Sequence, residues 1–317
     1  MSHYMGIDLG GTNIAAGVID ENGCVLSKQC LYTKPERGQA AVISDMAKAA
    51  EAAVKAAGIP LTDIPYIGIG IPGTVRSDTR EVIFAPNISW RGVQLEKEFR
   101  KHLDIPVFAA NDADCAALGE AYFGCAAKYN SALLITIGTG IGGGFIINKS
   151  IFFGCTGCGT EPGHMTVDYG GEQCACGKRG CFETVASATA LKRETRRAME
   201  KSRSSLMWEV CGGNLKNISG RTAFDAARRG DPLALVIINA YTDHLAAGVA
   251  SIVNIFWPEI VIIGGGISAE GDFLLDPLRE KMKKFSYAGD ILPMPKIMPA
   301  SLGNDAGIIG AALLGNN

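Results

Sequence analysis

The stretch Gly6-Ile-Asp-Leu-Gly-Gly-Thr-Asn-Ile-Ala-Ala-Gly-Val-Ile19 has a second, similar copy in Leu134-Ile-Thr-Ile-Gly-Thr-Gly-Ile-Gly-Gly-Gly-Phe-Ile-Ile147. Each copy consists of an apolar segment, a turn of glycine and threonine, and a second apolar segment, which is typical of a β-hairpin. The copies superpose at an offset of 128 residues. Self-similarity of this kind predicts a duplicated domain with one such hairpin in each half.

The segments outside the hairpins alternate between helical and extended hydrophobic patterns. Strands that alternate with helices predict a sheet covered by helices, and hence the α/β class. The pattern predicts strands over residues 66–71, 106–110 and 259–263, and helices over residues 40–57, 93–103, 113–124, 187–201, 222–229, 231–256, 276–285 and 306–314.

The chain has 317 residues, of which 47% are apolar and 20% charged, and this composition excludes disordered and fibrous proteins. The length predicts two domains with a cleft between them. The formal net charge is −2, without a block of one sign. We therefore expect small-molecule partners and neither nucleic acid nor a membrane as a binding partner.

The first eleven residues contain no basic segment followed by an apolar one, so we expect no signal peptide and a cytoplasmic protein. No uncharged apolar stretch predicts a membrane span. Ten cysteines in a reducing compartment favour metal ligands or buried thiols over disulfides. We expect core thiols at Cys24, Cys30, Cys115, Cys125 and Cys211, and spare or redox-sensitive thiols at Cys155 and Cys158.

Three glycine-rich turns follow predicted strands. The first contains Asp8, Gly10, Gly11, Thr12 and Asn13, the second Gly138, Thr139, Gly140 and Gly142, and the third Gly264, Gly265 and Gly266. Glycine has no Cβ, so backbone N–H groups in such turns can approach a phosphate. A tight hairpin turn is the alternative for the first, but three turns together predict a nucleotide site. None matches the P-loop pattern, and the first and third open no Rossmann-type helix, which disfavours both of those nucleotide folds.

The pair Asn111-Asp112 lies between a predicted strand and a predicted helix. Helix N-capping is the ordinary role of an aspartate at such a place. The alternative is catalytic, because ligands of α/β sheets bind at the carboxyl ends of the strands. A carboxylate there can accept a proton from a hydroxyl nucleophile.

One segment has the spacing of a metal site. His164, Cys174, Cys176 and Cys181 lie within eighteen residues, and three cysteines with one histidine fit a closed, tetrahedral zinc site of the structural kind. The surrounding insertion, residues 154–180, is rich in glycine and charge and has few apolar residues. We therefore expect metal binding to order it.

Two acidic residues flank this metal motif. Glu161 precedes His164 by three residues, and Glu183 follows Cys181 by two. Either alone would pass as a surface carboxylate. Together they are held by one loop, and carboxylates accept bidentate hydrogen bonds from vicinal hydroxyls, so the pair predicts a polyhydroxylated ligand.

As a set, these residues resemble the ROK family of sugar kinases, and within it the bacterial ROK-type glucokinases. The resemblance rests on Asp8-Leu-Gly-Gly-Thr-Asn13, Gly70-Ile-Pro-Gly73, Asn87, Asn111-Asp112, Thr136-Ile-Gly-Thr-Gly-Ile-Gly-Gly-Gly144, Glu161-Pro-Gly-His164, Cys174-Ala-Cys-Gly-Lys-Arg-Gly-Cys-Phe-Glu183, Gly264-Gly-Gly-Ile-Ser268 and Leu302-Gly-Asn-Asp-Ala-Gly307. One departure is Pro162, where the family usually has an aliphatic residue.

The resemblance implies an actin-like ATPase (ribonuclease H-like) fold with two related α/β domains around a nucleotide and sugar cleft. It places residues 1–113, completed by the C-terminal helix 303–317, in a smaller domain and residues 114–302, with the zinc loop 154–183, in a larger one. A homodimer or higher homo-oligomer is expected.

The implied activity is phosphorylation of a hexose by ATP with Mg²⁺, most simply glucose to glucose 6-phosphate, beside a structural Zn²⁺. Asp112 would be the general base, and the first two glycine turns would hold the ATP phosphates while the third lies near the adenosine. Asp8 would face Mg²⁺ through water. The sugar would be surrounded by Asn87, Asn111, Glu161, His164 and Glu183.

Three alternatives remain. The hexose could be mannose, allose, fructose or an N-acylhexosamine, because one hydroxyl can be read by one carboxylate. The family also includes sugar-responsive repressors, which carry a helix-turn-helix before the kinase-like part, whereas here the first phosphate motif begins at Gly6. A non-sugar actin-like ATPase would leave the metal motif and its two acids unexplained.

Overall fold

The computed structural model describes residues 2–155, 157 and 159–316 and confirms the α/β class. The chain forms two compact units, one of Met1–Leu134, Gly143–Thr160 and Ala300–Asn317, the other of Ile135–Gly142 and Glu161–Pro299. That the two domains divide near residue 113 stays a prediction. The first unit itself continues past that point, because helix α3 (Asp112–Tyr122) packs against α10 (Ala306–Ala312).

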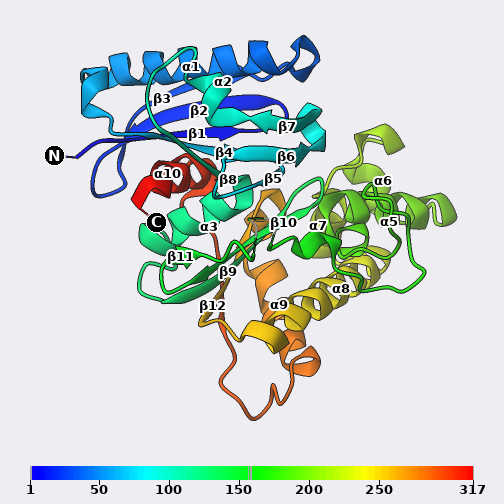
Figure 1. Cartoon of the computed structure of the whole chain (residues 1–317). Helices are drawn as coiled ribbons and strands as arrows, with labels where there is room; N and C mark the ends of the chain where they lie inside the picture. The colour runs from blue at the N-terminus through cyan, green and yellow to red at the C-terminus, as the bar shows by residue number, and fades with distance from the viewer. Residues whose placement is uncertain (1, 156, 158, 317) are drawn as a thin grey trace. The chain divides into compact units, whose positions relative to one another are not determined.

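The first unit contains a five-stranded sheet of order β3-β2-β1-β4-β8 (Figure 1). Its strands are β1 (Tyr4–Leu9), β2 (Asn13–Ile19), β3 (Val25–Tyr32), β4 (Ile67–Ile71) and β8 (Val107–Asn111). The strands β1, β4 and β8 run parallel, and their register places Asp8 beside Gly70 and Gly70 beside Ala110. Their carboxyl ends therefore meet at one edge of the sheet, which brings the first glycine turn near Asn111 and Asp112.

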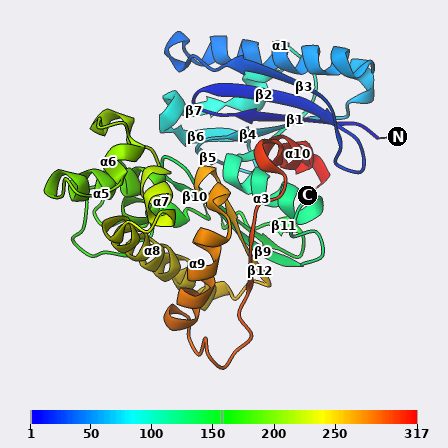
Figure 2. The same cartoon turned by 180° about the vertical axis from the view of Figure 1, so that it is seen from behind.

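Helices cover both faces of this sheet. Helix α1 (Gln39–Ala57) packs on β2 and β3, whereas α10 packs on β1 and β4 from the other face, as Figures 1 and 2 show. Two glycines permit the close approach of α10. A Cβ built on Gly6 would lie 1.9 Å from the carbonyl oxygen of Ile308, and one on Gly68 would lie 1.7 Å from that of Ala311.

A small antiparallel sheet follows β4, with the strands β5 (Thr74–Val75), β6 (Glu81–Ala85) and β7 (Trp90–Gln94). The helix predicted over 93–103 is wrong at both ends, since α2 spans only Leu95–Phe99. Val93 and Gln94 pair with Val82 and Glu81 of β6 instead. Cross-strand pairing decides their conformation, which the helical spacing of the apolar residues did not predict.

A second five-stranded sheet has the order β11-β10-β9-β12-β13. Its strands are β9 (Ser131–Ile137), β10 (Ile141–Ile147), β11 (Ser150–Ile151), β12 (Ile260–Gly264) and β13 (Lys296–Pro299). The repeat predicted from the sequence is confirmed at the level of the strands: β10 matches β2 residue for residue at the offset of 128. Chain boundaries between the two compact units fall inside β9 and β10.

The second unit also holds most of the helices. They are α4 (Glu183–Ala186), α5 (Ala188–Lys201), α6 (Met207–Val210), α7 (Thr222–Arg228), α8 (Pro232–Phe256) and α9 (Asp272–Phe285). The last begins four residues before its predicted start, because Leu274 and Leu275 are buried and extend its apolar face. Within the described residues, α8 alone is long and apolar enough to cross a membrane. More than half of that stretch is buried inside the protein, against α7 and α9, as in a core helix.

The expectation of core thiols is right for Cys115 and Cys211, which are buried, and wrong for Cys24 and Cys30, which are exposed. Cys30 lies in β3, an edge strand whose side chains alternate between the sheet's two faces and are largely exposed. Cys125 is half-buried and Cys155 exposed, and Cys158 lies outside the described residues.

Candidate active site and metal centre

The first helical turn of α3 separates the roles of Asn111 and Asp112. Asn111 is the N-cap: its side-chain oxygen accepts hydrogen bonds from the backbone N–H groups of Ala113 at 2.8 Å and Asp114 at 3.4 Å. The capping role considered for Asp112 is therefore wrong, since Asp112 is the first residue of the helix. Its carboxylate lies at the carboxyl edge of the parallel strands, where a proton acceptor is useful.

Asn111 also connects α3 to the segment between β4 and β5. Its side-chain N–H donates to the carbonyl oxygen of Gly73 at 3.1 Å. One N–H of the amide remains for a ligand, because an amide carries two donors. Asn111 is therefore first a positioning residue for Asp112, which its sequence context did not predict.

The first glycine turn is held by a residue that sequence reasoning missed. Thr33 is fully buried, its hydroxyl donates to the carbonyl oxygen of Gly10 at 2.7 Å, and its backbone N–H donates to that of Thr12 at 2.8 Å. A Cβ on Gly11 would lie 3.6 Å from the Cβ of Asn87. The turn, Asn87 and Thr33 thus form one packed group. No local motif marks Thr33, because its partners lie more than twenty residues away.

The substitution Thr33→Val should lower the free energy of unfolding by about 1–3 kcal/mol, because it leaves the partly buried carbonyl oxygen of Gly10 without its donor. Thr33→Ser retains the hydroxyl and should lower it much less. Urea denaturation measures both variants. Hydrogen exchange at Gly10 and Gly11 should accelerate in the valine variant only. Equal stability of the two would show that the hydroxyl does not hold the turn.

Asp8 lies at the end of β1 with its carboxylate against α10, where a Cβ on Gly307 would meet Oδ2 at 2.6 Å. Burial raises its pKa from 3.8 to about 6, against the opposing charge of Lys28. Lys28 itself pairs with Asp305 at 2.5 Å. The fold therefore holds a carboxylate in a place that disfavours its charge, which is typical of functional sites.

Asp8→Asn should stabilise the protein at pH 7.5, because the ionised carboxylate costs the folded state about 3 kcal/mol for a pKa raised by roughly two units. This gain should be complete about one pH unit above the folded-state pKa of about 6. It should shrink as the pH falls through 6 and disappear below 3.8, where the carboxyl group becomes protonated in both states. Urea denaturation of both proteins between pH 4 and 8 provides the test. A variant less stable than the wild type at pH 7.5 would contradict it.

The four predicted metal ligands come together in the second unit. The donor atoms of His164, Cys174, Cys176 and Cys181 all lie within 4.8 Å of one another. Cys176 Sγ lies 3.6 Å from Cys181 Sγ, and Cys174 Sγ lies 3.8 Å from His164 Nδ1. Zinc–sulfur bonds of about 2.3 Å in a tetrahedron place ligand atoms roughly 3.5–3.8 Å apart. The residues present therefore fit a zinc ion.

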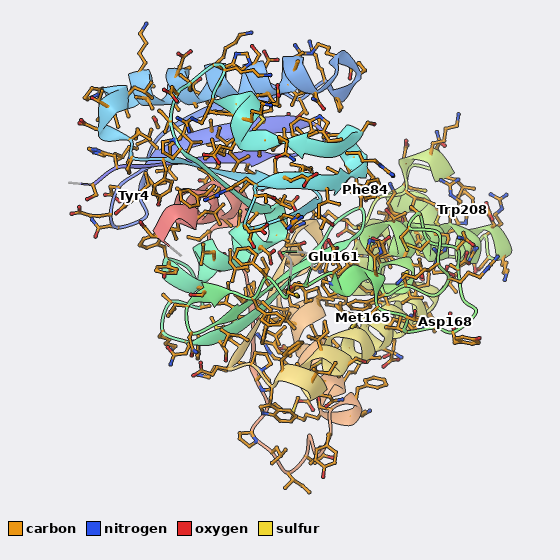
Figure 3. The ribbon with its side chains drawn as sticks, viewed as in Figure 1. Tyr4, Phe84, Glu161, Met165, Asp168 and Trp208 are labelled. Carbon is orange, nitrogen blue, oxygen red and sulfur yellow. The ribbon has the colours of Figure 1, made fainter. Side chains whose placement is uncertain are left out.

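Hydrogen bonds order the metal loop to a degree that its composition did not predict. Thr166 bridges to Cys181 and Gln173 to Arg179 in antiparallel fashion. Glu172 pairs with Arg197 of α5 at 2.6 Å, and the Lys178 ammonium donates to the carbonyl oxygen of His164 at 2.9 Å. Figure 3 labels Met165 and Asp168 on this loop. These contacts order the loop independently of any metal ion.

The two acids lie beside the metal cluster, as predicted from their spacing. Glu183 opens α4, and its Oε1 lies 3.0 Å from Cys174 Sγ and 3.9 Å from His164 Nδ1. Glu161, labelled in Figure 3, precedes a 3₁₀ turn (Pro162–His164) in which Pro162 occupies the first position, a place that suits proline. Burial raises the pKa of Glu161, as does Glu183, while His164 opposes the rise.

The second glycine turn contacts this group. The Ala188 N–H donates to the carbonyl oxygen of Gly138 at 3.0 Å, and a Cβ on Gly140 would lie 2.4 Å from Oε2 of Glu183. The third turn lies beside the end of β9. Gly265 has a φ of +79°, and a Cβ there would lie 2.4 Å from the carbonyl oxygen of Ile137. The second glycine turn therefore lies close to Glu183 and to the start of α5.

The predicted site residues thus form two groups, one in each unit. The first contains Asp8, the turn at Gly10, Asn87, Asn111 and Asp112, and the second contains Glu161, His164, Glu183, the three cysteines and the turns at Gly138 and Gly264.

Comparisons with known proteins identify the family of the chain. Residues 4–317 match the model of the ROK family. The chain is 40% identical to a glucokinase of Thermotoga maritima, over 97% of this chain and 95% of that protein, and 37% identical to a glucokinase of Streptomyces coelicolor, over 98% and 97%. Among solved structures, a ROK family glucokinase from Streptomyces griseus in complex with glucose and AMPPNP has a TM-score of 0.85 and 34% identity, covering 99% of this chain and all of that one.

The structural neighbours include ROK sugar kinases, and the chain has their actin-like ATPase fold, as expected from the motifs. The match covers nearly the whole chain and includes the glycine turns, the Asn111-Asp112 pair and the Cys and His cluster. The protein belongs to the ROK family.

Proposed function

We propose that the protein phosphorylates D-glucose with ATP to form glucose 6-phosphate. Relatives named glucokinase at 35–40% identity over nearly the whole chain, and the similar glucokinase structure with glucose and AMPPNP, support this activity. The structural observation that carries it is the position of Asp112. Its carboxylate opens α3 at the strand edge that also holds the first glycine turn, while Asn111 takes over the capping role.

In the proposed reaction, Asp112 accepts the proton of the sugar's 6-hydroxyl as that oxygen attacks the γ-phosphorus. The bond from the γ-phosphorus to the bridging oxygen of ADP breaks in line. Such transfers depend mainly on positioning and on electrostatic stabilisation, so the protein's task is to hold both substrates. Asn87, Glu161, His164, Glu183 and the remaining N–H of Asn111 supply polar groups that would hold the sugar.

The glycine turns would hold the nucleotide. The turns at Gly10–Asn13 and Gly138–Gly142 present backbone N–H groups to phosphates, and the turn at Gly264–Gly266 would lie near the adenosine. Magnesium, when bound with ATP, neutralises charge on the β- and γ-phosphates. Asp8 would face magnesium through water. This role would explain why a carboxylate is retained where burial disfavours its charge.

The metal cluster would hold a structural zinc ion. The donor set of three cysteines and one histidine leaves no open position for substrate, as is typical of structural sites. A histidine that binds zinc through one ring nitrogen keeps the other for a hydrogen bond. His164 could thus serve the metal and the sugar together. We also propose that the protein is a cytoplasmic homo-oligomer that binds neither nucleic acid nor a membrane.

A coupled assay of ADP release over a panel of hexoses tests the proposal. Glucose should give the highest kcat/KM, and a 6-deoxyglucose analogue should bind without turnover. If mannose, allose, fructose or an N-acylhexosamine exceeds glucose by more than about tenfold, or about 1.4 kcal/mol, the hexose assignment is wrong and the kinase class stands. Sugar binding without any ADP release would indicate a sugar-sensing regulator instead.

A further inference from the structure

We propose that Gly140 positions the carboxylate of Glu183, so that the second glycine turn determines the affinity for the sugar as well as for ATP. The inference rests on the proposed function, because it takes Glu183 as a sugar-binding group. Gly140 is a positioning residue in this scheme: it acts through Glu183 and makes no contact with the hexose itself.

The evidence is the space around the Glu183 side chain. A Cβ on Gly140 would lie 2.4 Å from Oε2 and 3.5 Å from Cδ of Glu183, and the shorter separation is one that real Cβ atoms essentially never show. On its other side, Oε1 lies 3.0 Å from Cys174 Sγ. The carboxylate is therefore confined between the metal cluster and the turn, and only a glycine at position 140 leaves it this position.

The backbone of Glu183 cannot move away easily. The N–H of Ala188, which begins α5 directly after α4, donates to the carbonyl oxygen of Gly138 at 3.0 Å and ties this segment to the same turn. Phe182, the preceding residue, is fully buried, and a Cβ on Gly248 of α8 would lie 2.1 Å from its ring. A Cβ added at position 140 should therefore rotate the Glu183 side chain and leave its backbone in place.

The same turn offers a matched control. A Cβ on Gly138 meets no atom within 4 Å. Neither Gly138 nor Gly140 has a positive φ, so alanine is compatible with the backbone at both positions. The two alanine variants therefore add the same methyl group to the same turn, and only one of them displaces Glu183.

The experiment measures glucose binding by calorimetry without nucleotide, so that effects on ATP do not contribute. Gly140→Ala should weaken glucose binding by about tenfold or more, whereas Gly138→Ala should change it by less than twofold. The KM for ATP is measured for both variants as well. A role of the second glycine turn in phosphate binding predicts an increase in each. Because the clash involves the flexible end of a side chain, the melting temperature of Gly140→Ala should stay near that of the wild type.

A double-mutant cycle tests whether the effect passes through Glu183. In the background Glu183→Ala, which removes the clashing carboxylate, Gly140→Ala should no longer weaken glucose binding. If Gly140→Ala does not fold, the double variant should fold, since the clash is gone. Failure of both to fold would place the constraint on the backbone and overturn the inference.

Two further results would also overturn it: glucose binding by Gly140→Ala within twofold of the wild type, or a penalty that persists in full without the Glu183 carboxylate. A wild-type protein that binds no hexose would overturn the proposed function as well. If the panel identifies another hexose, the same variants titrated with that sugar decide the role of Gly140.

Discussion

Asp112→Asn should lower kcat by about 10²–10⁴-fold, the usual contribution of a general base. The amide cannot accept the proton of the attacking hydroxyl, although its size and its place at the start of α3 are unchanged. Asn111, which caps the helix, is untouched by this substitution, so the fold should persist. The measurement is steady-state turnover of glucose and ATP, together with glucose binding by calorimetry.

The control for this variant is Asn111→Asp, which keeps a capping oxygen but loses the N–H that reaches the carbonyl oxygen of Gly73. It should retain the helix and lower turnover through the position of Asp112, with a smaller loss than Asp112→Asn. Near-normal turnover in Asp112→Asn would remove Asp112 from the mechanism. A large loss of glucose binding in that variant would assign it to the sugar site instead.

In the proposed zinc site, Cys176→Ser should release the zinc or leave it loosely held, because its thiolate would be one of four ligands and structural zinc contributes about 10–16 kcal/mol of apparent binding energy in small peptides. Glu161, His164 and Glu183 are positioned by the loop around the cluster. Glucose KM should therefore rise at least tenfold, and kcat should fall. The measurements are metal analysis and separate titrations of glucose and ATP.

The effect on ATP should be smaller but present. Oε2 of Glu183 faces Gly140, and Ala188 is hydrogen-bonded to Gly138, so the loop contacts the second glycine turn. The first turn lies in the other compact unit, where Thr33 holds it. Cys155→Ser is the matched control, because Cys155 is exposed and outside the cluster. Stoichiometric zinc and unchanged glucose affinity in Cys176→Ser would exclude it as a ligand, and equal damage to both substrates would indicate general unfolding.

The sequence was sufficient for features that depend on neighbours along the chain. The two hairpins of the repeat were predicted, because apolar segments and glycine turns are local properties of the chain. The metal cluster was predicted by ligand spacing, since a loop of this length can close four donors around one ion. Because Glu161 and Glu183 flank these four residues in the sequence, the same loop brings the two acids near the cluster.

Tertiary structure decided what depends on residues far apart in the sequence. Val93 and Gln94 became strand because β6 pairs with them, and Cys30 became exposed because β3 is an edge strand. Thr33 reaches Gly10, and Glu183 reaches Gly140, only after the chain has folded. Periodicity and motifs report local φ/ψ preferences and burial, whereas the position of a carboxylate within an ångström follows from which atoms pack around it, and that is a property of the whole fold.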